Sequence, residues 1–454
     1  MKIFVVKNQQ LLGSLIEENG NIKFIYHNKI PSSSYLNGLN KKENISKTLF
    51  SIFENMLPEF EQVKLIKSQN NLTSEIEVLL YLNNVHGSFE FYTEEEFKNK
   101  EFKIQSIFQY NEVKDEILDN EYIFPNILEY DLNIDYSILY PEGLTNSKVI
   151  GLSGYQYKFS VIKDDVQNKI SYDETKNSNY FMKPYSKYYS TYVGNDKDRS
   201  YIPFLLVNEH IFMTLARDLG FSIPYNAIIK DGNDYHYIIK RFDRYEKLKI
   251  DHQEILTLMN KKSDQKYTIT MRDIFETVKE YISQNEIEEL YRFIIFSIVI
   301  GHGDLHGKNL SLIYLSNKFD EKNMQLSPYY DISTTKIYKD TKVNDIGLKI
   351  GSKKSNIKRI DLLSFAKLIK ISNDRANELI KEVSYKFKDT FERYIEKLPN
   401  SIKSLPYHVN KYGGIKPFEE VLKEYYKNRV DSLYKKEFIE KLEAKNTQED
   451  DIWD

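Results

Sequence analysis

One stretch of the chain places a dense polar loop between two apolar elements. The run NEIEELYRFIIFSIVI at 285–300 begins with an Asn and, three residues later, a Glu, which is a capping-box-like opening of a helix. Its long apolar remainder predicts that this helix is buried. The loop GHGDLHGKN follows at 301–309, and LSLIY after it has the composition of a strand. The polar side chains of this loop either cap turns or handle a ligand such as a phosphate.

Strand patterns come first in the chain, and helical patterns dominate after residue 270. The opening 26 residues have the pattern of β-strands broken by the turn signals KNQQ and ENGN. Strands are also expected in FSVIKD and SNYFMKP, and AIIKDGNDYHYIIKRFDR predicts a hairpin around DGND. A helix is expected between Pro203 and Gly220.

Three further segments complete this outline. Helical spacing in SKTLFSIFENMLPEFEQVKLIKSQ is interrupted at Pro58, and residues 360–440 continue as amphipathic helices. The strongly charged stretch from about 90 to 125 predicts an exposed linker or a connecting helix. The expected organisation is therefore a β-rich lobe followed by a helical lobe.

Composition limits the classes of function. With 454 residues, 41% of them hydrophobic, the chain can form two or three cooperating subdomains. The net charge of -3 argues against a chain that binds nucleic acid along its whole length, and KKSDQK at 261–266 and KKSNIKR at 353–359 fit solvated loop faces. The chain has no cysteine, which excludes disulfides, thiolate metal sites and a Cys nucleophile.

Targeting signals are not expected. MKIFVVKNQQ lacks the apolar region and the cleavage site of a secretion signal, and the longest apolar run, FIIFSIVI, is too short to span a bilayer. We therefore expect a cytoplasmic protein without a membrane partner.

The polar loop contains the residue types that phosphoryl transfer requires. Asp304 and Asn309 are five residues apart, the spacing of the catalytic-loop Asp and the metal-binding Asn in kinases, and Asp331 in YYDIST lies 22 residues further on. The pattern D-x-x-x-x-N alone is weak, but the buried helix before it and the strand after it strengthen it. Lys183, on the predicted strand YFMK, supplies a cation for phosphates.

Other segments fit a nucleotide cleft. LSGYQYKFS offers Gly154 and neighbouring amides as a phosphate cradle, with Lys158 adding charge, although it is not a Walker A loop. Glu209, in the helix after Lys183, either pairs with that lysine as in protein kinases or is a surface charge. KRFDR at 240–244 ends a strand, where a kinase hinge offers backbone groups to adenine, or it is an ordinary ion-paired strand end.

Two other chemistries fit less well. His302 and His306 are four residues apart, but H-E-x-x-H is absent, and the two glycines of the segment disfavour the helix that such a zinc site needs. A Ser hydrolase lacks its nucleophile elbow, because G-x-S-x-G does not occur.

With these motifs in hand, the chain resembles the HipA family of bacterial toxin serine/threonine kinases over nearly its whole length. FENMLPEF and VHGSFEFY look like motifs of the family's N-terminal subdomain, and SGYQYKFS resembles its phosphate loop. FMKP, NEHIFMTLARDLG, KRFDR, GHGDLHGKNLSLIY and YYDIST resemble its strand Lys, first long helix, hinge, catalytic loop and metal-binding element.

The resemblance implies an α+β, two-lobed, protein-kinase-like fold. It has a β-rich N-terminal lobe with an extra N-terminal subdomain and an all-helical C-terminal lobe. The expected domains are 1–120, 121–245 and 246–445.

The resemblance also implies a role for each matching residue, with Mg-ATP as cofactor. Asp304 would be the catalytic base, Lys183 a catalytic lysine, and Asn309 and Asp331 the magnesium ligands. His306 and Asp243 would contact the ribose, and the backbone of Lys240 and Phe242 the adenine. The residues implied in ATP binding are Ser153, Gly154, Gln156, Lys158, Lys183, Lys240, Phe242, Asp243, His306, Lys308, Asn309 and Asp331.

Regulation and partners are implied in the same way. Family members inactivate themselves by autophosphorylating a Ser of the phosphate loop, and because Gly151 occupies the earlier acceptor position, Ser153 is the acceptor left in this motif and would take the phosphate. The implied partner is a small helix-turn-helix antitoxin, HipB-like, through which the kinase would reach operator DNA. Known family substrates include an aminoacyl-tRNA synthetase, whose phosphorylation arrests translation.

Two alternatives stay open. HGDLHGKN also resembles the loop of aminoglycoside phosphotransferases, which would make the chain a small-molecule kinase, although those enzymes carry neither MLPE nor SGYQYK. A pseudokinase-like binding module would regulate a partner without turnover, but it has no need of Lys183, Asp304, Asn309 and Asp331 together.

Overall fold

The computed structural model describes most of the chain. The predicted phosphate-loop residues Ser153, Gly154 and Gln156 lie outside it. The described residues are 1–28, 30, 36–58, 60–82, 85–102, 108–119, 121–133, 158–172, 178–185, 204–232, 234–246, 248–317, 323–338, 344–408 and 414–440.

The chain begins with a five-stranded antiparallel sheet in the order β4-β3-β2-β1-β5. The two predicted turns are confirmed: Asn8 and Gln9 join the first two strands, and Asn19 and Gly20 the next two, each with a positive φ. The strands are β1 (Lys2–Lys7), β2 (Gln10–Glu18), β3 (Asn21–Tyr26), β4 (Glu43–Ser46) and β5 (Phe89–Tyr92).

The prediction of an exposed linker from about residue 90 is wrong at its start. β5 is buried along its whole length and pairs with β1. Three of its four side chains, those of Phe89, Phe91 and Tyr92, are aromatic and favour a strand, although the surrounding sequence is strongly charged. The connecting helices expected further on are present as α4 (Glu94–Asn99) and α5 (Tyr110–Leu118).

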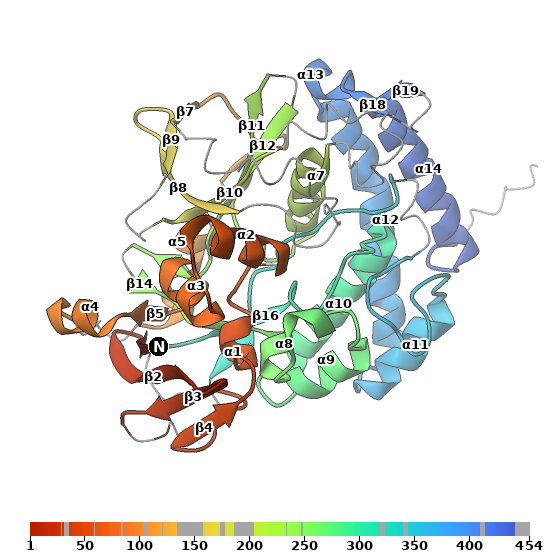
Figure 1. Ribbon diagram of the computed structural model, residues 1–454. Helices are drawn as coiled ribbons and strands as arrows, with labels where there is room; N and C mark the ends of the chain where they lie inside the picture. Colours follow the sequence, from red (N-terminus) through yellow and green to blue (C-terminus); the bar gives the residue numbers. More distant parts are fainter. Residues whose placement is uncertain are drawn as a thin grey trace, which may run out of the picture.

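Three helices pack beside the first sheet, and we call the sheet and these helices the N-terminal unit (Figure 1, red to orange). Phe53 packs its ring against Phe24, Phe89 and Phe91 of the sheet. The predicted interruption at Pro58 separates the first two of the helices, which are α1 (Ser51–Glu54), α2 (Phe60–Asn70) and α3 (Glu75–Leu82).

A seven-stranded sheet in the order β6-β11-β12-β10-β8-β9-β7 forms the next layer. The hairpin predicted around DGND is confirmed as β11 and β12, and the predicted helix is α7 (Leu205–Asp218), which packs on these two strands. The strands are β6 (Ile127–Leu128), β7 (Asp131–Asn133), β8 (Phe159–Asp164), β9 (Lys169–Tyr172), β10 (Tyr180–Lys183), β11 (Asn226–Asp231) and β12 (Asp234–Lys240).

Helices dominate the rest of the chain, and the long ones gather on one side of the molecule (Figure 1, green to blue). The long helix α12 packs against α10, α11 and α14, and the second half of α10 is completely buried. The helices are α8 (Ile255–Leu258), α9 (Met271–Val278), α10 (Gln284–Ile300), α11 (Arg359–Leu368), α12 (Asn373–Lys397), α13 (Asn400–Lys403) and α14 (Phe418–Lys435), with the 3-10 helix η3 (Ser263–Gln265).

The cap of α10 differs from the prediction. The capping box is formed by Ser283 and Glu286, two residues before the predicted Asn285 and Glu288. The helix ends at Gly301 with a φ of 73°, where an added Cβ would lie 2.3 Å from Cγ of Lys336. This tight ending turns the chain directly into the polar loop.

The helical lobe also contains short strands. β15 (His252–Glu254), β16 (Ser311–Tyr314) and β17 (Met324–Leu326) form one sheet, which supports both ends of the segment between the polar loop and Asp331. The pairs β13 (Arg244–Tyr245) with β14 (Leu248–Lys249), and β18 (Pro406–His408) with β19 (Ile415–Pro417), are smaller. The predicted two-lobed organisation is confirmed with this addition, and the domain limits at 120, 245 and 445 stay predictions.

No helix in the described ranges is long and apolar enough to cross a membrane.

Candidate active site

A buried lysine joins three separate parts of the chain. Lys183, at the end of β10, donates to both carboxylate oxygens of Glu209 on α7 at 2.7 Å each, and also to Oδ1 of Asp331. Lys158 lies 3.2 Å from the other Asp331 oxygen. We call Lys158, Lys183, Glu209 and Asp331 the site cluster. The pairing of Lys183 with Glu209, which the sequence left open, is therefore present.

The site cluster holds its charges by mutual attraction. Burial alone would lower the pKa of Lys183, but the carboxylates of Asp331 and Glu209 raise it above its ordinary value, so the lysine is a cation. Burial alone would raise the pKa of Asp331, but Lys158 and Lys183 lower it well below the ordinary value. Burial raises the pKa of Glu209, an effect that Lys183 opposes.

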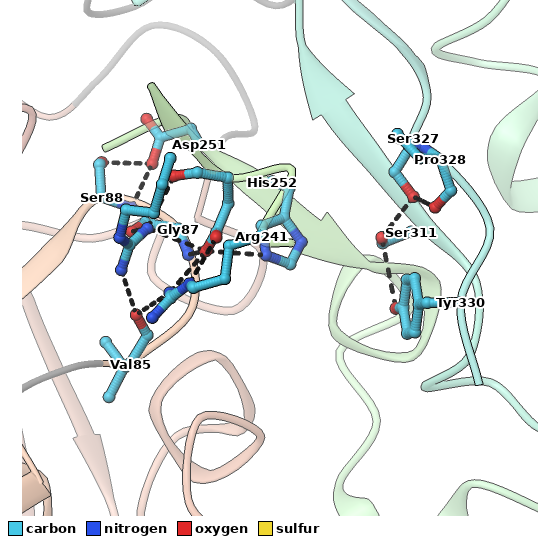
Figure 2. Close-up of polar contacts among 12 residues, drawn as sticks. Val85, Gly87, Ser88, Arg241, Asp251, His252, Ser311, Ser327, Pro328 and Tyr330 are labelled. Carbon is cyan, nitrogen blue, oxygen red and sulfur yellow. Dashed lines mark hydrogen bonds and ion pairs between the residues drawn. The ribbon is translucent and has the colours of Figure 1, made fainter. Parts of the chain in front are cut away.

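The backbone places Asp331 in an uncommon conformation. Its φ is 55°, in the left-handed region, which costs a residue other than Gly roughly 1–2 kcal/mol. The preceding Tyr330 fixes this loop to the polar loop, since its hydroxyl donates to the carbonyl of Lys308 at 2.8 Å and lies 3.4 Å from Oγ of Ser311. Figure 2 shows Tyr330 beside Ser311, with Ser327 on the other side of that serine.

The polar loop brings Asn309 to the same carboxylate. Nδ2 of Asn309 lies 3.5 Å from Oδ2 of Asp331, and its Oδ1 accepts the backbone N–H of His306 at 3.0 Å. Asp304, from the same loop, is half-buried and accepts a hydrogen bond from the hydroxyl of Tyr267 on Oδ1. The polar loop therefore brings Asn309 to Asp331, and Asp304 lies in the same loop.

Both histidines of the loop are neutral near pH 7. Burial lowers the pKa of His302 to about 4, and lowers that of His306 well below its ordinary value. Nδ1 of His306 accepts the backbone N–H of Lys308, so its proton is on Nε2. Nδ1 of His302 donates to the carbonyl of Ser333 at 2.8 Å, which connects the polar loop to the segment after Asp331.

The donor set fits a magnesium ion shared with phosphates. Magnesium prefers oxygen ligands and is often held by one or two protein carboxylates together with substrate phosphates and water. Asp331 is an anion beside the Asn309 amide, and two ammonium groups now balance its charge. No group of three or more His, Asp or Glu side chains arranged for a metal is found in the part of the chain that the structure describes, so the fit depends on a ligand that brings its own oxygens.

Of the remaining residues predicted to contact ATP, Phe242 packs against the loop of Asp331, whereas the side chains of the two lysines have partners elsewhere. Phe242 is half-buried and stacks on Tyr330 with ring centroids 5.7 Å apart. Nζ of Lys240 donates to the carbonyl of Glu116 at 2.8 Å. Nζ of Lys308 points toward the N-terminal unit, where it donates to the carbonyl of Asn55 at 3.2 Å.

Asp243 lies in a separate buried network where the N-terminal unit meets the strands after β12. Its carboxylate accepts from Arg241 and from the backbone N–H of Gly87, and it pairs with Arg244 at 2.9 Å. Asp251 beside it pairs with Lys7 at 2.6 Å and accepts from Ser88. We call Lys7, Arg241, Asp243, Arg244 and Asp251 the joint cluster.

Figure 2 shows Val85, Gly87 and Ser88 facing Arg241, Asp251 and His252 across this joint. The pKa of Asp243 lies well below its ordinary value, because Arg241 and Arg244 outweigh the effect of burial. This arrangement gives Asp243 a role in holding the N-terminal unit. Its contact with a ribose stays a prediction.

Comparison with known proteins defines the family. A family model described as HipA-like C-terminal domain matches residues 150–391, more than half of the chain. The chain belongs to the HipA family. The matched range includes Lys183, Glu209, Asp304, Asn309 and Asp331.

Relatives of this HipA family chain are distant in sequence. A Haemophilus influenzae protein named "Putative kinase" is 27% identical over 205 residues, which are 42% of this chain and 54% of the relative. The serine/threonine-protein kinase toxin HipA of Shewanella oneidensis is 24% identical over 159 residues, 30% of this chain and 35% of the relative. The matches therefore span about half of the first relative and a third of the second.

A solved structure extends the likeness to nearly the whole fold. A chain of the Shewanella oneidensis complex of HipA, HipB and operator DNA matches with a TM-score of 0.65 at 14% identity. The match covers 95% of this chain and 97% of the other. The HipA-like kinase fold is therefore present, and the roles of individual site residues stay predictions.

Proposed function

We propose that this HipA family chain is a Mg-ATP-dependent serine/threonine protein kinase and the toxin component of a toxin-antitoxin system. The observation that supports this most directly is Lys183, held between Glu209 and Asp331 beside Asn309. This arrangement combines a phosphate-binding ammonium group with the oxygen ligands of a metal.

In the proposed reaction, each described side chain has one task. Lys183, fixed by Glu209, exchanges its contact with Asp331 for phosphate oxygens. Asp304 accepts the proton of the acceptor hydroxyl, and the neutral His306 donates from Nε2 to the ribose. When bound, magnesium neutralises the charge of the phosphates at Asn309 and Asp331.

The proposed partners follow from the family. The Shewanella oneidensis HipA structure contains HipB and operator DNA, and we propose that a HipB-like helix-turn-helix antitoxin binds this chain and connects it to DNA. The proposed substrate is a cytoplasmic protein such as an aminoacyl-tRNA synthetase. Ser153 is the proposed site of self-inactivation.

The test is phosphate transfer from Mg-ATP, followed by intact and peptide mass spectrometry. Asp304→Ala should abolish transfer, because the acceptor hydroxyl loses its base, while calorimetry should give a Mg-ATP affinity within about threefold of wild type. Asp389→Ala, an exposed aspartate on α12, serves as the control and should transfer normally. If Asp304→Ala transfers phosphate at the parent rate, the assigned base is wrong. If the wild-type protein phosphorylates a small-molecule acceptor but no protein, the chain is a small-molecule kinase.

A further inference from the structure

A segment outside the predicted motifs forms part of the wall of the site. The backbone N–H of Gly307, in the polar loop, donates to the carbonyl of Lys266 at 3.1 Å. An added Cβ on Gly307 would lie 2.6 Å from Cδ1 of Ile269, so Ile269 packs closely against this glycine and would have to shift for a larger residue. Residues 266–269 are therefore fixed to the polar loop by both backbone and side-chain packing.

Tyr267 lies in this segment and reaches the candidate base. Its hydroxyl donates to Oδ1 of Asp304, and its ring meets that of His306 edge to face with centroids 5.1 Å apart. The ammonium groups of Lys266 and Lys354 lie 5.6 Å and 6.0 Å from the ring centroid. Each of the two lysine-rich segments, expected to be solvated loop faces, thus contributes one cation to this tyrosine.

The other end of the same segment is held by the N-terminal unit. The backbone N–H of Ser263 donates to Glu54 at 3.0 Å, and Nδ2 of Asn55 donates to the carbonyl of Lys261 at 2.8 Å. Residues 261–269 therefore connect α1 with the polar loop, and Tyr267 is anchored from both directions.

We infer that Tyr267 is a positioning residue for Asp304 and fixes the plane of the carboxylate that receives the proton of the acceptor. The inference depends on the proposed kinase function. A hydroxyl that donates to a base either orients it or competes with the acceptor for it. The contacts of Lys266 and Ile269 with Gly307 favour orientation, because the segment cannot move aside without breaking them.

Tyr267→Phe tests this by removing the hydroxyl and keeping the ring. The value of kcat should fall about tenfold while KM for ATP stays constant, since a hydrogen bond to a charged group is lost at the base alone. The acid limb of the pH–rate profile should move up by about one pH unit, because a carboxylate without this donor is harder to ionise. A role limited to stability would leave that limb in place.

Tyr394→Phe is the matched control, because the Tyr394 hydroxyl also donates to a carboxylate, that of Asp218, away from the site. It should leave kcat and the pH profile unchanged. If Tyr267→Phe behaves like this control, or if it raises kcat as a competitor's removal would, the inference is overturned.

An inactive wild-type protein would instead contradict the proposed function. In that case a second measurement tests whether Tyr267 positions the polar loop. Hydrogen exchange of residues 301–310 should be about tenfold faster in Tyr267→Phe than in Tyr394→Phe, because the loop loses one of its anchors. Equal exchange in the two variants would overturn the positioning role.

Discussion

The site cluster and the joint cluster are both buried groups of opposite charges, but they differ in their partners. The contacts described within the site cluster run between side chains. In the joint cluster, Asp243 and Asp251 also accept backbone N–H groups of Gly87 and Ser88, and Arg244 donates to the carbonyl of Val85 at 2.9 Å. Side chains can exchange partners for a ligand, whereas backbone groups cannot leave without unfolding.

The solvent exposure of the side chains also differs between the two clusters. The side chain of Asp331 is 25% exposed and that of Lys158 is 40% exposed, while those of Arg241 and Asp243 are 0% and 5% exposed. A ligand can therefore reach the site cluster but not the joint cluster. Buried ion pairs of the same kind can therefore exchange partners in the site cluster and hold two units together in the joint cluster.

The largest effect on catalysis is expected at the site cluster. Asp331→Asn should lower kcat/KM about a thousandfold, because the proposed magnesium site would lose its anionic ligand. The free energy of unfolding should fall by about 1–2 kcal/mol, less than for the matched change in the joint cluster, because Lys158 and Lys183 lose one counter-charge while Lys183 keeps Glu209 and Asn tolerates a positive φ. Steady-state phosphorylation and urea unfolding measure the two quantities. A large loss of stability with little loss of rate would instead place Asp331 among the structural anchors.

The matched change in the joint cluster should have the opposite outcome. Asp243→Asn should lower the free energy of unfolding by about 3 kcal/mol, because Arg241 and Arg244 stay buried without their counter-charge. The Mg-ATP affinity of the folded variant should stay within about threefold of wild type. Urea unfolding and calorimetry provide the comparison. A tenfold weaker nucleotide affinity at unchanged stability would show that Asp243 contacts the ribose.

Local patterns were sufficient for much of the fold. The hairpin of β11 and β12 and the turns of the first sheet follow from residues close together in the sequence. β5 was missed because its partner β1 lies more than 80 residues earlier. The cap of α10 was misplaced because Ser283 with Glu286 and Asn285 with Glu288 have the same spacing, and only the start of the hydrogen-bond ladder distinguishes them.

The candidate site also contains residues that the sequence predicts and residues that it does not. Asp304, Asn309 and Asp331 have a spacing that a sequence can show. The side of α7 that faces Lys183 depends on how the helix packs on the sheet, so the pairing of Glu209 stayed open. Tyr267 gave no signal, because its lysine-rich surroundings resemble a solvated loop and its partner Asp304 follows 37 residues later.

The site also contains contacts between side chains and backbone groups, and the pH dependence of one of them, that of His302, is the smallest effect expected here. His302 connects the polar loop to the carbonyl of Ser333, and its pKa of about 4 in the folded chain lies below the ordinary 6.5. The unfolded chain therefore binds more protons between these values, so the stability contributed by neutral His302 is complete above pH 6.5 and is lost as the pH falls toward 4.

His302→Asn keeps a donor for the Ser333 carbonyl but has no group that takes up this proton. Between pH 6.5 and 5, the free energy of unfolding of the wild-type chain should fall by about 1.5 kcal/mol more than that of the variant. Urea unfolding at the two pH values measures the difference. If the free energy of unfolding falls equally in the two proteins, His302 is not held neutral. The contact between the polar loop and the Asp331 segment would then be as exchangeable as the contacts of the site cluster.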